Sequence, residues 1–424
     1  MRIRLIAFAL VPAGVTLALA GCGSGSNQAA AGAAATAGAT ATAGSAAPAT
    51  PSAAAKATAA PSSASKTMTA PTCRSTQTGT VETAALTGLQ FVSAAQGWAV
   101  GQNTILETSD GGAHWVPQLS GKLNLTSVDF ISGQDGWAVG STALLATTDG
   151  GAHWTQLSEP CPLIRSVHFI SPETGFAVAG GSDVSGSTPA YGGTVLATSN
   201  GGRSWHAAAA PADAQTVCFS NKQNGWLGAD GLLYRTSDGG QVWMSVTTAG
   251  GQDESGGADD TAAMNVECAA NGSAWALSVG PGAAMSQEPH VGYHADQSGA
   301  TAIFAEQYFQ AGSGPSAQSP GSDAGPFSAI DSAEAVFIDS CPACGNGTAP
   351  WDVATRSGAT LLKEGNVGSI TEPGAASFLS PETGWVAGTE SVYPASGASR
   401  SQERIVATTD GGRTWHVQWA GPWM

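Results

Sequence analysis

The cysteines are the residues of this chain whose type and spacing most directly suggest chemistry. Cys341 and Cys344 form Cys-Pro-Ala-Cys, which resembles a redox-active thiol pair. Thiol activation favours a helix start, whereas this segment is predicted to be a loop, so we expect a local structural disulfide rather than redox catalysis. A zinc site would need a second ligand pair nearby, and the sequence shows none. We therefore expect neither a metal nor another cofactor.

Cys22 has a different context, close to the N-terminus. Arg2 and Arg4 precede an apolar run from Leu5 to Ala20, a layout typical of an export signal and too short for a membrane span. The run ends in Leu-Ala-Gly-Cys22, which resembles the bacterial lipobox, whose cysteine is acylated and becomes the first residue of the mature protein. The resemblance implies a signal peptide over residues 1–21 and a lipid anchor on Cys22, with plain secretion as the alternative. We expect an exported protein, held at the outer face of a bacterial cell membrane.

Residues 22–72 are predicted to be a disordered tether. After Cys22 this stretch is mostly Ala, Thr, Ser, Gly and Pro, its only charges are Lys56 and Lys66, and it has no aromatic residue that could build a core. The chain has a net charge of −16 and no acid before residue 73, so the four cations there leave −20 on residues 73–424. Such an acidic domain is repelled by nucleic acid, which argues against nucleic acid as a partner.

A phrase of the form Thr-Ser/Thr-Asp/Asn-Gly-Gly-x-x-Trp occurs five times along residues 73–424. The aspartate is expected to bind turn amides two residues on, the glycines to supply positive φ, the hydroxyl to bind another turn amide, and the tryptophan to be buried beside the turn. The phrase is therefore a structural element rather than a catalytic one. The five pairs of turn residue and tryptophan are Asp110 and Trp115, Asp149 and Trp154, Asn200 and Trp205, Asp238 and Trp243, and Asp410 and Trp415.

Each phrase closes a longer repeat of about 40 residues with four short predicted strands, the pattern of a propeller blade. A Gly-Trp pair marks the second strand, with Phe176 replacing the tryptophan once. The fold class is thus all-β: a seven-bladed β-propeller of four-stranded antiparallel blades, preceded by a disordered linker, with six or eight blades as alternatives. Residues 74–86 are expected to add a strand to the last blade. The blades are placed at residues 76–121, 122–159, 160–210, 211–249, 262–309, 327–365 and 374–420.

The phrase is similar to the Asp-box, or bacterial neuraminidase repeat. Gly-Trp-Ala-Val-Gly140 followed by Thr147-Thr-Asp-Gly-Gly-x-x-Trp154 is most similar to the propellers of the photosystem II stability/assembly factor family. This resemblance covers residues 88–248 and 374–420 and implies the propeller fold. Sortilin-type receptors and xyloglucanases carry the same box, so the resemblance does not define an activity. Nothing in the sequence indicates a photosynthetic context.

Long insertions are expected on one face of the propeller, opposite the box turns. They join strands two and three at 180–193, 281–290, 340–350 and 389–403, and they join blades at 249–261 and 310–326. Such a clustering is typical of the binding face of a repeat array, although surface loops also drift in length at low cost. The contact residues expected on this face are Asp183, Tyr191, His290, Tyr393 and Arg400.

Polar residues also recur at one position of the first predicted strand of each blade, and they form a second group of candidate functional residues. Some of them are expected to line the central tunnel, where an accidental polar lining is far commoner than a cation site. They are Gln90, Asp129, His168, Cys218, Glu267 and Ser377.

The six cysteines after Cys22 are an even set, which favours disulfides outside the cytoplasm. Cys218 and Cys268 fall in neighbouring first strands and are one candidate pair, which would leave Cys73 with Cys161.

These observations predict a surface-anchored, non-catalytic and monomeric β-propeller lipoprotein. Its partner is expected to be a protein or a cell-surface glycan bound at the insertion-rich face. The alternative is a glycoside hydrolase of the Asp-box propeller type, similar to a sialidase or a xyloglucanase. A sialidase needs an arginine triad that the few arginines here do not form, and a xyloglucanase uses a cleft between two propellers. A carboxylate pair in the funnel of one propeller is the remaining enzymatic possibility.

Overall fold

The computed structural model describes a set of segments within one compact unit, Ser65–Met424. Predictions that fall before residue 86, including those for Cys22, Cys73 and the strand at 74–85, lie outside the described residues. The segments cover residues 86–102, 104–120, 124–140, 143–158, 164–180, 193–208, 210–211, 214–229, 231–246, 248–249, 263–269, 271–280, 290–306, 323–340, 352–357, 360–393 and 397–424.

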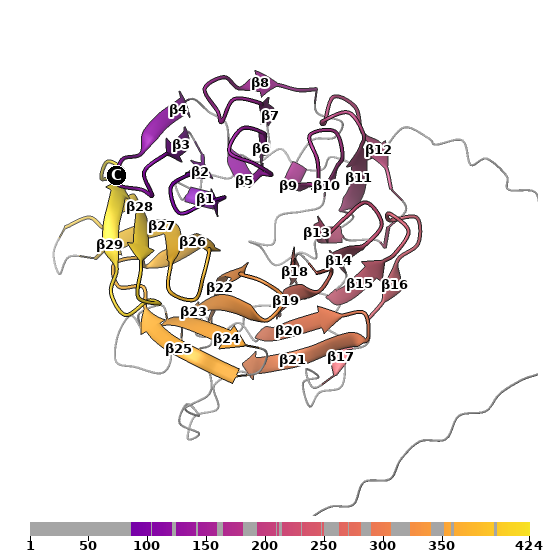
Figure 1. The fold of residues 1–424 in the computed structure, drawn as a ribbon. Helices are drawn as coiled ribbons and strands as arrows, with labels where there is room; N and C mark the ends of the chain where they lie inside the picture. Colours follow the sequence, from indigo (N-terminus) through magenta and orange to yellow (C-terminus); the bar gives the residue numbers. More distant parts are fainter. Residues whose placement is uncertain are drawn as a thin grey trace, which may run out of the picture. The chain divides into compact units, whose positions relative to one another are not determined.

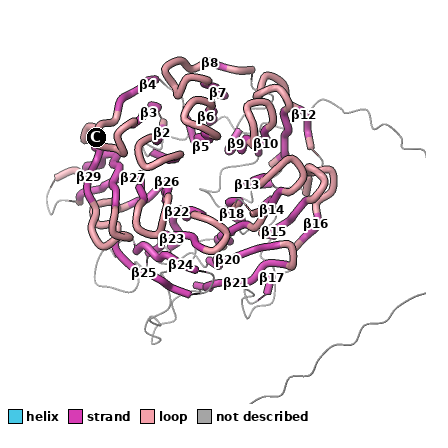
Figure 2. The backbone as a smooth tube through the Cα atoms, in the orientation of Figure 1, coloured by secondary structure: helices cyan, strands magenta, loops and turns pink. Residues whose placement is uncertain are grey.

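Seven antiparallel sheets stand around a central axis, and each consists of strands that follow one another in the chain. Figure 1 shows the innermost strand of each sheet beside the axis and the outermost at the periphery, and Figure 2 shows that strands and loops make up the described residues. The prediction of a seven-bladed propeller with four-stranded blades is confirmed. No helix long and apolar enough to cross a membrane occurs within the described segments.

Blades 1 to 4 come from the four regular repeats, and the outer strand shortens to two residues in blades 2 to 4. Blade 1 contains β1 (Leu86–Phe91), β2 (Gly97–Gly101), β3 (Thr104–Thr108) and β4 (Val116–Ser120). Blade 2 contains β5 (Leu125–Phe130), β6 (Gly136–Gly140), β7 (Leu144–Thr147) and β8 (Thr155–Gln156). Blade 3 contains β9 (Ile164–Phe169), β10 (Gly175–Ala179), β11 (Thr194–Thr198) and β12 (His206–Ala207). Blade 4 contains β13 (Ala214–Phe219), β14 (Gly225–Ala229), β15 (Leu232–Thr236) and β16 (Met244–Ser245).

Blades 5 and 6 keep the strand pattern although their boxes are degraded or missing, and blade 7 again has a box. Blade 5 contains β18 (Ala263–Cys268), β19 (Ala274–Val279), β20 (His290–Asp296) and β21 (Gly299–Glu306), and β17 (Thr248–Ala249) adds a parallel fifth strand at its outer edge. Blade 6 contains β22 (Asp323–Ala329), β23 (Glu334–Ser340), β24 (Asp352–Ser357) and β25 (Thr360–Asn366). Blade 7 contains β26 (Glu372–Phe378), β27 (Gly384–Val392), β28 (Arg400–Thr408) and β29 (His416–Ala420).

The hydrophobic core is divided into seven clusters, and each cluster lies between two neighbouring blades. In blades 1, 2 and 7, the Gly-Trp tryptophan stacks on the phenylalanine that ends the inner strand of the next blade. Trp98 on Phe130 and Trp137 on Phe169 have ring centroids 3.5 Å apart, and Phe176 stacks on Phe219 at the same separation. Phe176 thus replaces the tryptophan in blade 3. These face-to-face contacts fix the spacing of adjacent blades.

The ring closes by packing of blade 7 against blade 1. Phe91 stacks on Trp385 with centroids 3.6 Å apart, and the two residues share a core cluster with Leu86 and Ile405. All four strands of blade 7 come from the C-terminal segment, and Leu86 begins the inner strand of blade 1. The strand expected over residues 74–86 therefore contributes only Leu86 to the described structure, and it does so in blade 1.

One predicted insertion is a β-structure. Residues 389–403 were expected to be a loop, but β27 and β28 continue through most of this segment, with Thr389 paired to Glu403 and Val392 to Arg400. Blade 7 therefore carries an extended hairpin on the insertion-rich face. The added pairs between β27 and β28 satisfy the backbone N–H and C=O groups of this segment. The insertions at 181–192, 281–289 and 341–351 lie outside the described residues.

Candidate functional site

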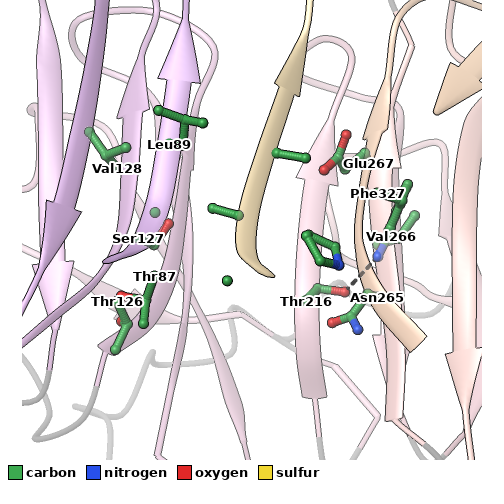
Figure 3. A pocket seen from close by; sticks show the side chains of 16 residues that line it. Thr87, Leu89, Thr126, Ser127, Val128, Thr216, Asn265, Val266, Glu267 and Phe327 are labelled. Atoms are coloured by element: carbon green, nitrogen blue, oxygen red, sulfur yellow. Dashed lines mark hydrogen bonds between the residues drawn. The ribbon is translucent and has the colours of Figure 1, made fainter. Parts of the chain in front are cut away.

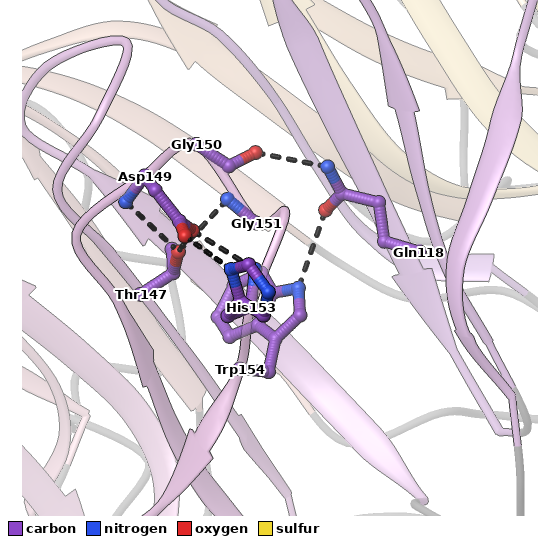
Figure 4. Close-up of polar contacts among 7 residues, drawn as sticks. All are labelled: Gln118, Thr147, Asp149, Gly150, Gly151, His153 and Trp154. Atoms are coloured by element: carbon purple, nitrogen blue, oxygen red, sulfur yellow. Dashed lines mark hydrogen bonds and ion pairs between the residues drawn. The ribbon is translucent and has the colours of Figure 1, made fainter.

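The Asp-box turns are closed networks of hydrogen bonds. In blade 2, Thr147 Oγ1 donates to Asp149 Oδ1 at 2.9 Å and accepts from the amide of Gly151 at 2.8 Å. Asp149 Oδ1 accepts from the amide of His153 at 2.9 Å, while Oδ2 lies 2.6 Å from Nδ1 of the His153 ring (Figure 4). The predicted role of the hydroxyl is confirmed. The aspartate differs from the prediction, because it binds the amide four residues on rather than two.

The same network recurs in the other four boxes, including the one with asparagine. Asn200 Oδ1 accepts from the Ser204 amide at 2.9 Å, as an aspartate does. Hydrogen bonds to the carboxylate hold the pKa of three exposed aspartates at about 2: the ring of His114 is the main donor to Asp110, the amide of His153 to Asp149, and the hydroxyl of Thr414 to Asp410. The same hydrogen bonds that lower the pKa tie each carboxylate to its own turn, which fits a structural role for the boxes.

Two glutamines connect neighbouring boxes, and the sequence reasoning missed them. Gln118 of β4 donates from Nε2 to the carbonyl of Gly150 at 2.9 Å, and its Oε1 accepts from Trp154 Nε1 at 3.2 Å (Figure 4). A side chain on Gly151, whose φ is +91°, would collide with Gln118, so the second glycine allows this approach. Gln418 of β29 makes the equivalent contact with the Gly111 carbonyl. The sequence signal that could have predicted these contacts is a glutamine three residues after the box tryptophan.

A single inner-strand position connects every blade to the next. The residue just before the end of this strand bonds the backbone at the end of the next blade's inner strand. We call these seven residues the inner ring. Gln90 bonds the amide and carbonyl of Phe130, Asp129 the amide of Phe169, His168 the carbonyl of Phe219, Glu267 the amide of Ala329, Ser328 the amide of Phe378 and Ser377 the amide of Phe91, and Cys218 forms a disulfide with Cys268.

The positions of the inner-ring side chains correct the prediction made for the polar residues of the first strands. Its members were expected to line the tunnel in part, but their side chains reach sideways to the next blade. Ser328 belongs to the set and was missed, because blade 6 lacks a box to align it. No group of three His, Cys, Asp or Glu residues able to hold a metal occurs among the residues that the structure describes. The ring is therefore a structural connection between blades, and its member Glu267 also lines the tunnel pocket described below.

The predicted disulfide between Cys218 and Cys268 is present, with Cα atoms 5.6 Å apart. It occupies the inner-ring position between blades 4 and 5, so a covalent bond stands where the other blades use a hydrogen bond. Cys73, Cys161, Cys341 and Cys344 lie outside the described residues, and their pairings stay predictions.

The tunnel contains a pocket of about 280 Å³, lined by sixteen residues of the inner strands of blades 1, 2, 4, 5, 6 and 7 (Figure 3). These residues stand in the middle of their strands, and none is the first or last residue of its strand. Several belong to bulges: Thr87 and Thr126 each stand where the register of β1 or β5 shifts. A bulge redirects side chains, which here brings hydroxyls to the wall of the pocket.

Glu267 is the one ionisable side chain among the sixteen. Burial raises its pKa from 4.5 to about 7, although its Oε2 accepts a hydrogen bond from the Ala329 amide at 2.7 Å. A protonated carboxyl in the folded state and an ionised one in the unfolded chain make stability depend on pH.

We expect the free energy of unfolding to fall as pH rises from about 4.5 to about 7, because within this window the folded state holds a proton that the unfolded chain has lost. The loss attributable to Glu267 is at most about 3 kcal/mol. Urea unfolding at several pH values measures it, and Glu267→Gln is expected to match the original protein at pH 4 and to exceed it at pH 8. Burial also raises the pKa of Glu403 to about 7, so the stability of this variant is still expected to depend on pH in part. Parallel pH profiles for the two proteins would contradict the assignment.

The five predicted contact residues have different positions. Asp183 and Tyr191 lie outside the described residues. His290, the first residue of β20, is only 2% exposed, so its prediction as a surface contact is wrong: the ladder of blade 5 begins at this residue and encloses it.

Tyr393 and Arg400 flank the tip of the extended hairpin, and Tyr393 is 70% exposed. The guanidinium of Arg400 stands 5.1 Å from the ring centre of Trp423, and Ser401 and Met424 exchange two backbone hydrogen bonds beside them. We call Tyr393, Arg400, Trp423 and Met424 the hairpin patch. Behind it, a salt bridge of 2.5 Å between Arg404 and Glu390 crosses the two strands.

Comparison with known proteins agrees with the box and the blades. Residues 72–214, which include blades 1 to 3, match the family model of the photosynthesis system II assembly factor YCF48. The resemblance predicted from the repeats is thereby confirmed over these residues. No curated protein matches the chain.

Solved structures with the same architecture are distant in sequence. YCF48 from Cyanidioschyzon merolae is 14% identical over 78% of this chain and 84% of its own, with a TM-score of 0.35. An ancestral GH74 enzyme is 13% identical over 80% of this chain and 47% of its own, with a TM-score of 0.42. The GH74 xyloglucanase from Xanthomonas campestris is 13% identical over 76% of this chain and 62% of its own, with a TM-score of 0.32. This chain thus spans less than two thirds of either GH74 enzyme.

Proposed function

We propose that this protein is a non-catalytic, surface-anchored β-propeller that binds a protein or cell-wall glycan partner through its insertion-rich face. The observation that carries the proposal is the hairpin patch. Aromatic and guanidinium groups exposed together on a rigid hairpin are enriched at binding surfaces, since they supply contact area at low cost in conformational entropy. The extended ladder and the Arg404–Glu390 salt bridge hold this hairpin in place.

The distribution of carboxylates supports binding rather than glycoside hydrolysis. Most glycosidases use two carboxyl groups that flank the scissile bond. The sixteen residues around the tunnel pocket include one, Glu267. The other inner-ring acid, Asp129, does not line this pocket; its carboxylate accepts a hydrogen bond from the amide of Phe169. The described part of the funnel therefore does not assemble the pair that the hydrolase alternative requires.

Anchoring through Cys22 is part of the proposal. The lipobox-like sequence at Leu19–Cys22 precedes a tether long enough to hold the propeller away from a bilayer. Cells that express Cys22→Ala are expected to lose the protein from the membrane fraction, because that variant lacks the acylated residue. Immunoblots of membrane and medium fractions measure the change, and unchanged retention of Cys22→Ala would contradict the lipid anchor.

The binding role is tested by cross-linking capture from intact cells. The triple variant Tyr393→Ala, Arg400→Ala, Trp423→Ala is expected to lose the cross-linked partner, with at least about a tenfold drop in yield if these residues act as anchors. The matched control is Val242→Ala, Met244→Ala, which removes exposed apolar groups at the box end of blade 4. Equal capture by both variants would remove the support for the hairpin patch. Turnover of labelled glycans by the purified protein would instead favour the hydrolase.

A further inference from the structure

The tunnel pocket presents hydrogen-bond acceptors. Three of its threonine hydroxyls donate their single proton to a backbone carbonyl: Thr87 to Leu125 at 2.9 Å, Thr126 to Arg165 at 3.1 Å, and Thr216 to Met264 at 2.9 Å. A hydroxyl whose proton is committed in this way has only lone pairs left for a ligand, and in Thr216 one of these already accepts from the Val266 amide at 3.0 Å (Figure 3). Three such groups on the wall of one pocket favour a ligand that brings its own donors.

Glu267 supplies the charge in this pocket. One carboxylate oxygen accepts from the Ala329 amide, and the other has no further partner among the described residues. Asn265 stands two residues before Glu267 on β18, so both side chains lie on the same face of the strand and line the pocket. The strands packed against β18 are β13, β14, β19 and β22, and their sequences contain no Lys, Arg or His and one acid, Asp323. No cation on these strands neutralises Glu267.

Most of the remaining wall of the pocket is apolar. Leu89, Val128, Val266 and Phe327 line the pocket, as do small residues that include Ala375. A divalent cation such as Ca²⁺ takes six to eight oxygen ligands, commonly with several carboxylates, whereas this pocket has one carboxylate. An ammonium group has three donors and one charge, which matches one carboxylate, nearby acceptor oxygens and a short apolar wall.

We propose that the tunnel pocket binds a compact ligand that carries a protonated primary amine on a short aliphatic chain. The ammonium is held by the Glu267 carboxylate together with the oxygens of Thr216 and Asn265, which lie on the same side of the pocket as Glu267 (Figure 3). The aliphatic part contacts Val266 and Phe327. The site is separate from the hairpin patch. It binds its ligand whether or not that patch captures a partner, so the two proposals fail independently.

The test is calorimetric titration of the purified full chain with n-butylammonium chloride at about pH 8, where Glu267 is ionised. Saturable binding is expected, with n-butanol at least about tenfold weaker because it has no charge to pair with the carboxylate. Equal binding of n-butanol and n-butylammonium, or no binding of either, would overturn the proposal. Saturable binding of calcium chloride that excludes n-butylammonium would show a metal site and would also overturn it.

Glu267→Gln is the decisive variant, and the chain itself shows that glutamine fits there. Gln90 occupies the same inner-ring position in blade 1 and accepts from the Phe130 amide, so the glutamine introduced in this variant is expected to keep the bond to the Ala329 amide. The variant is expected to bind n-butylammonium at least about tenfold more weakly. Asp129→Asn is the matched control, because it changes an inner-ring acid that does not line the pocket. Unchanged affinity in Glu267→Gln, or an equal loss in both variants, would refute the role of Glu267.

Discussion

The Trp98→Ala variant is expected to lose about 3–5 kcal/mol of unfolding free energy, enough to threaten the folded state of a single domain. Trp98 is fully buried between blades 1 and 2, and its ring stacks on Phe130 with centroids 3.5 Å apart. Its Nε1 also donates to the Gly150 carbonyl at 3.1 Å. Alanine would leave a cavity at a contact that sets the spacing of two blades, and the neighbouring sheets cannot close it without disturbing the ring.

Trp98→Phe is the matched control, since blade 3 has phenylalanine at this position. Phe176 stacks on Phe219 at 3.5 Å, as Trp98 stacks on Phe130. The Gly150 carbonyl keeps the hydrogen bond from Gln118 when the indole is lost, so no buried acceptor is left without a partner. We expect Trp98→Phe to cost about 1–2 kcal/mol. Urea denaturation of the three proteins measures the order, and a phenylalanine variant as unstable as the alanine one would contradict the stacking argument.

The box turns and the Gly-Trp strands could be predicted from the sequence because their chemistry is local. Thr147, Asp149 and Gly151 lie within five residues of one another, so the phrase itself contains donors, acceptors and the required φ. Spacing between phrases then determined the number and limits of the blades, including the degraded blade 5. The replacement of tryptophan by Phe176 was also visible, because its place in the repeat was kept.

The inner ring, the pocket and the extended hairpin could not be predicted in the same way. A residue such as Gln90 bonds Phe130, forty residues away, and only the twist and spacing of folded blades show that these atoms meet. The acceptor character of the pocket depends on bulges that direct Thr87 and Thr126 inward. Residues 389–403 have the Gly and Ser content of a loop, but pairing along β27 and β28 overrides that composition.

Removal of the Cys218–Cys268 disulfide is the second change with a large expected effect. The bond joins the inner strands of blades 4 and 5 across 50 residues, and loss of such a link costs about 2–5 kcal/mol. We expect the double variant Cys218→Ala, Cys268→Ala to show this loss in urea denaturation. Changing both residues avoids a free thiol, whose exchange with other cysteines would confuse the comparison.

The inner ring predicts a partial rescue by serine. Ser328 and Ser377 occupy the position of Cys218 in blades 6 and 7, and each accepts an amide of the next blade at 3.0 Å. The variant Cys218→Ser, Cys268→Ala is therefore expected to recover about 1 kcal/mol relative to the double alanine variant, since the hydroxyl can accept the amide of residue 268. Equal stability of the two double variants would mean that this position between blades 4 and 5 needs a covalent bond, and that the seven blades do not share one mode of connection.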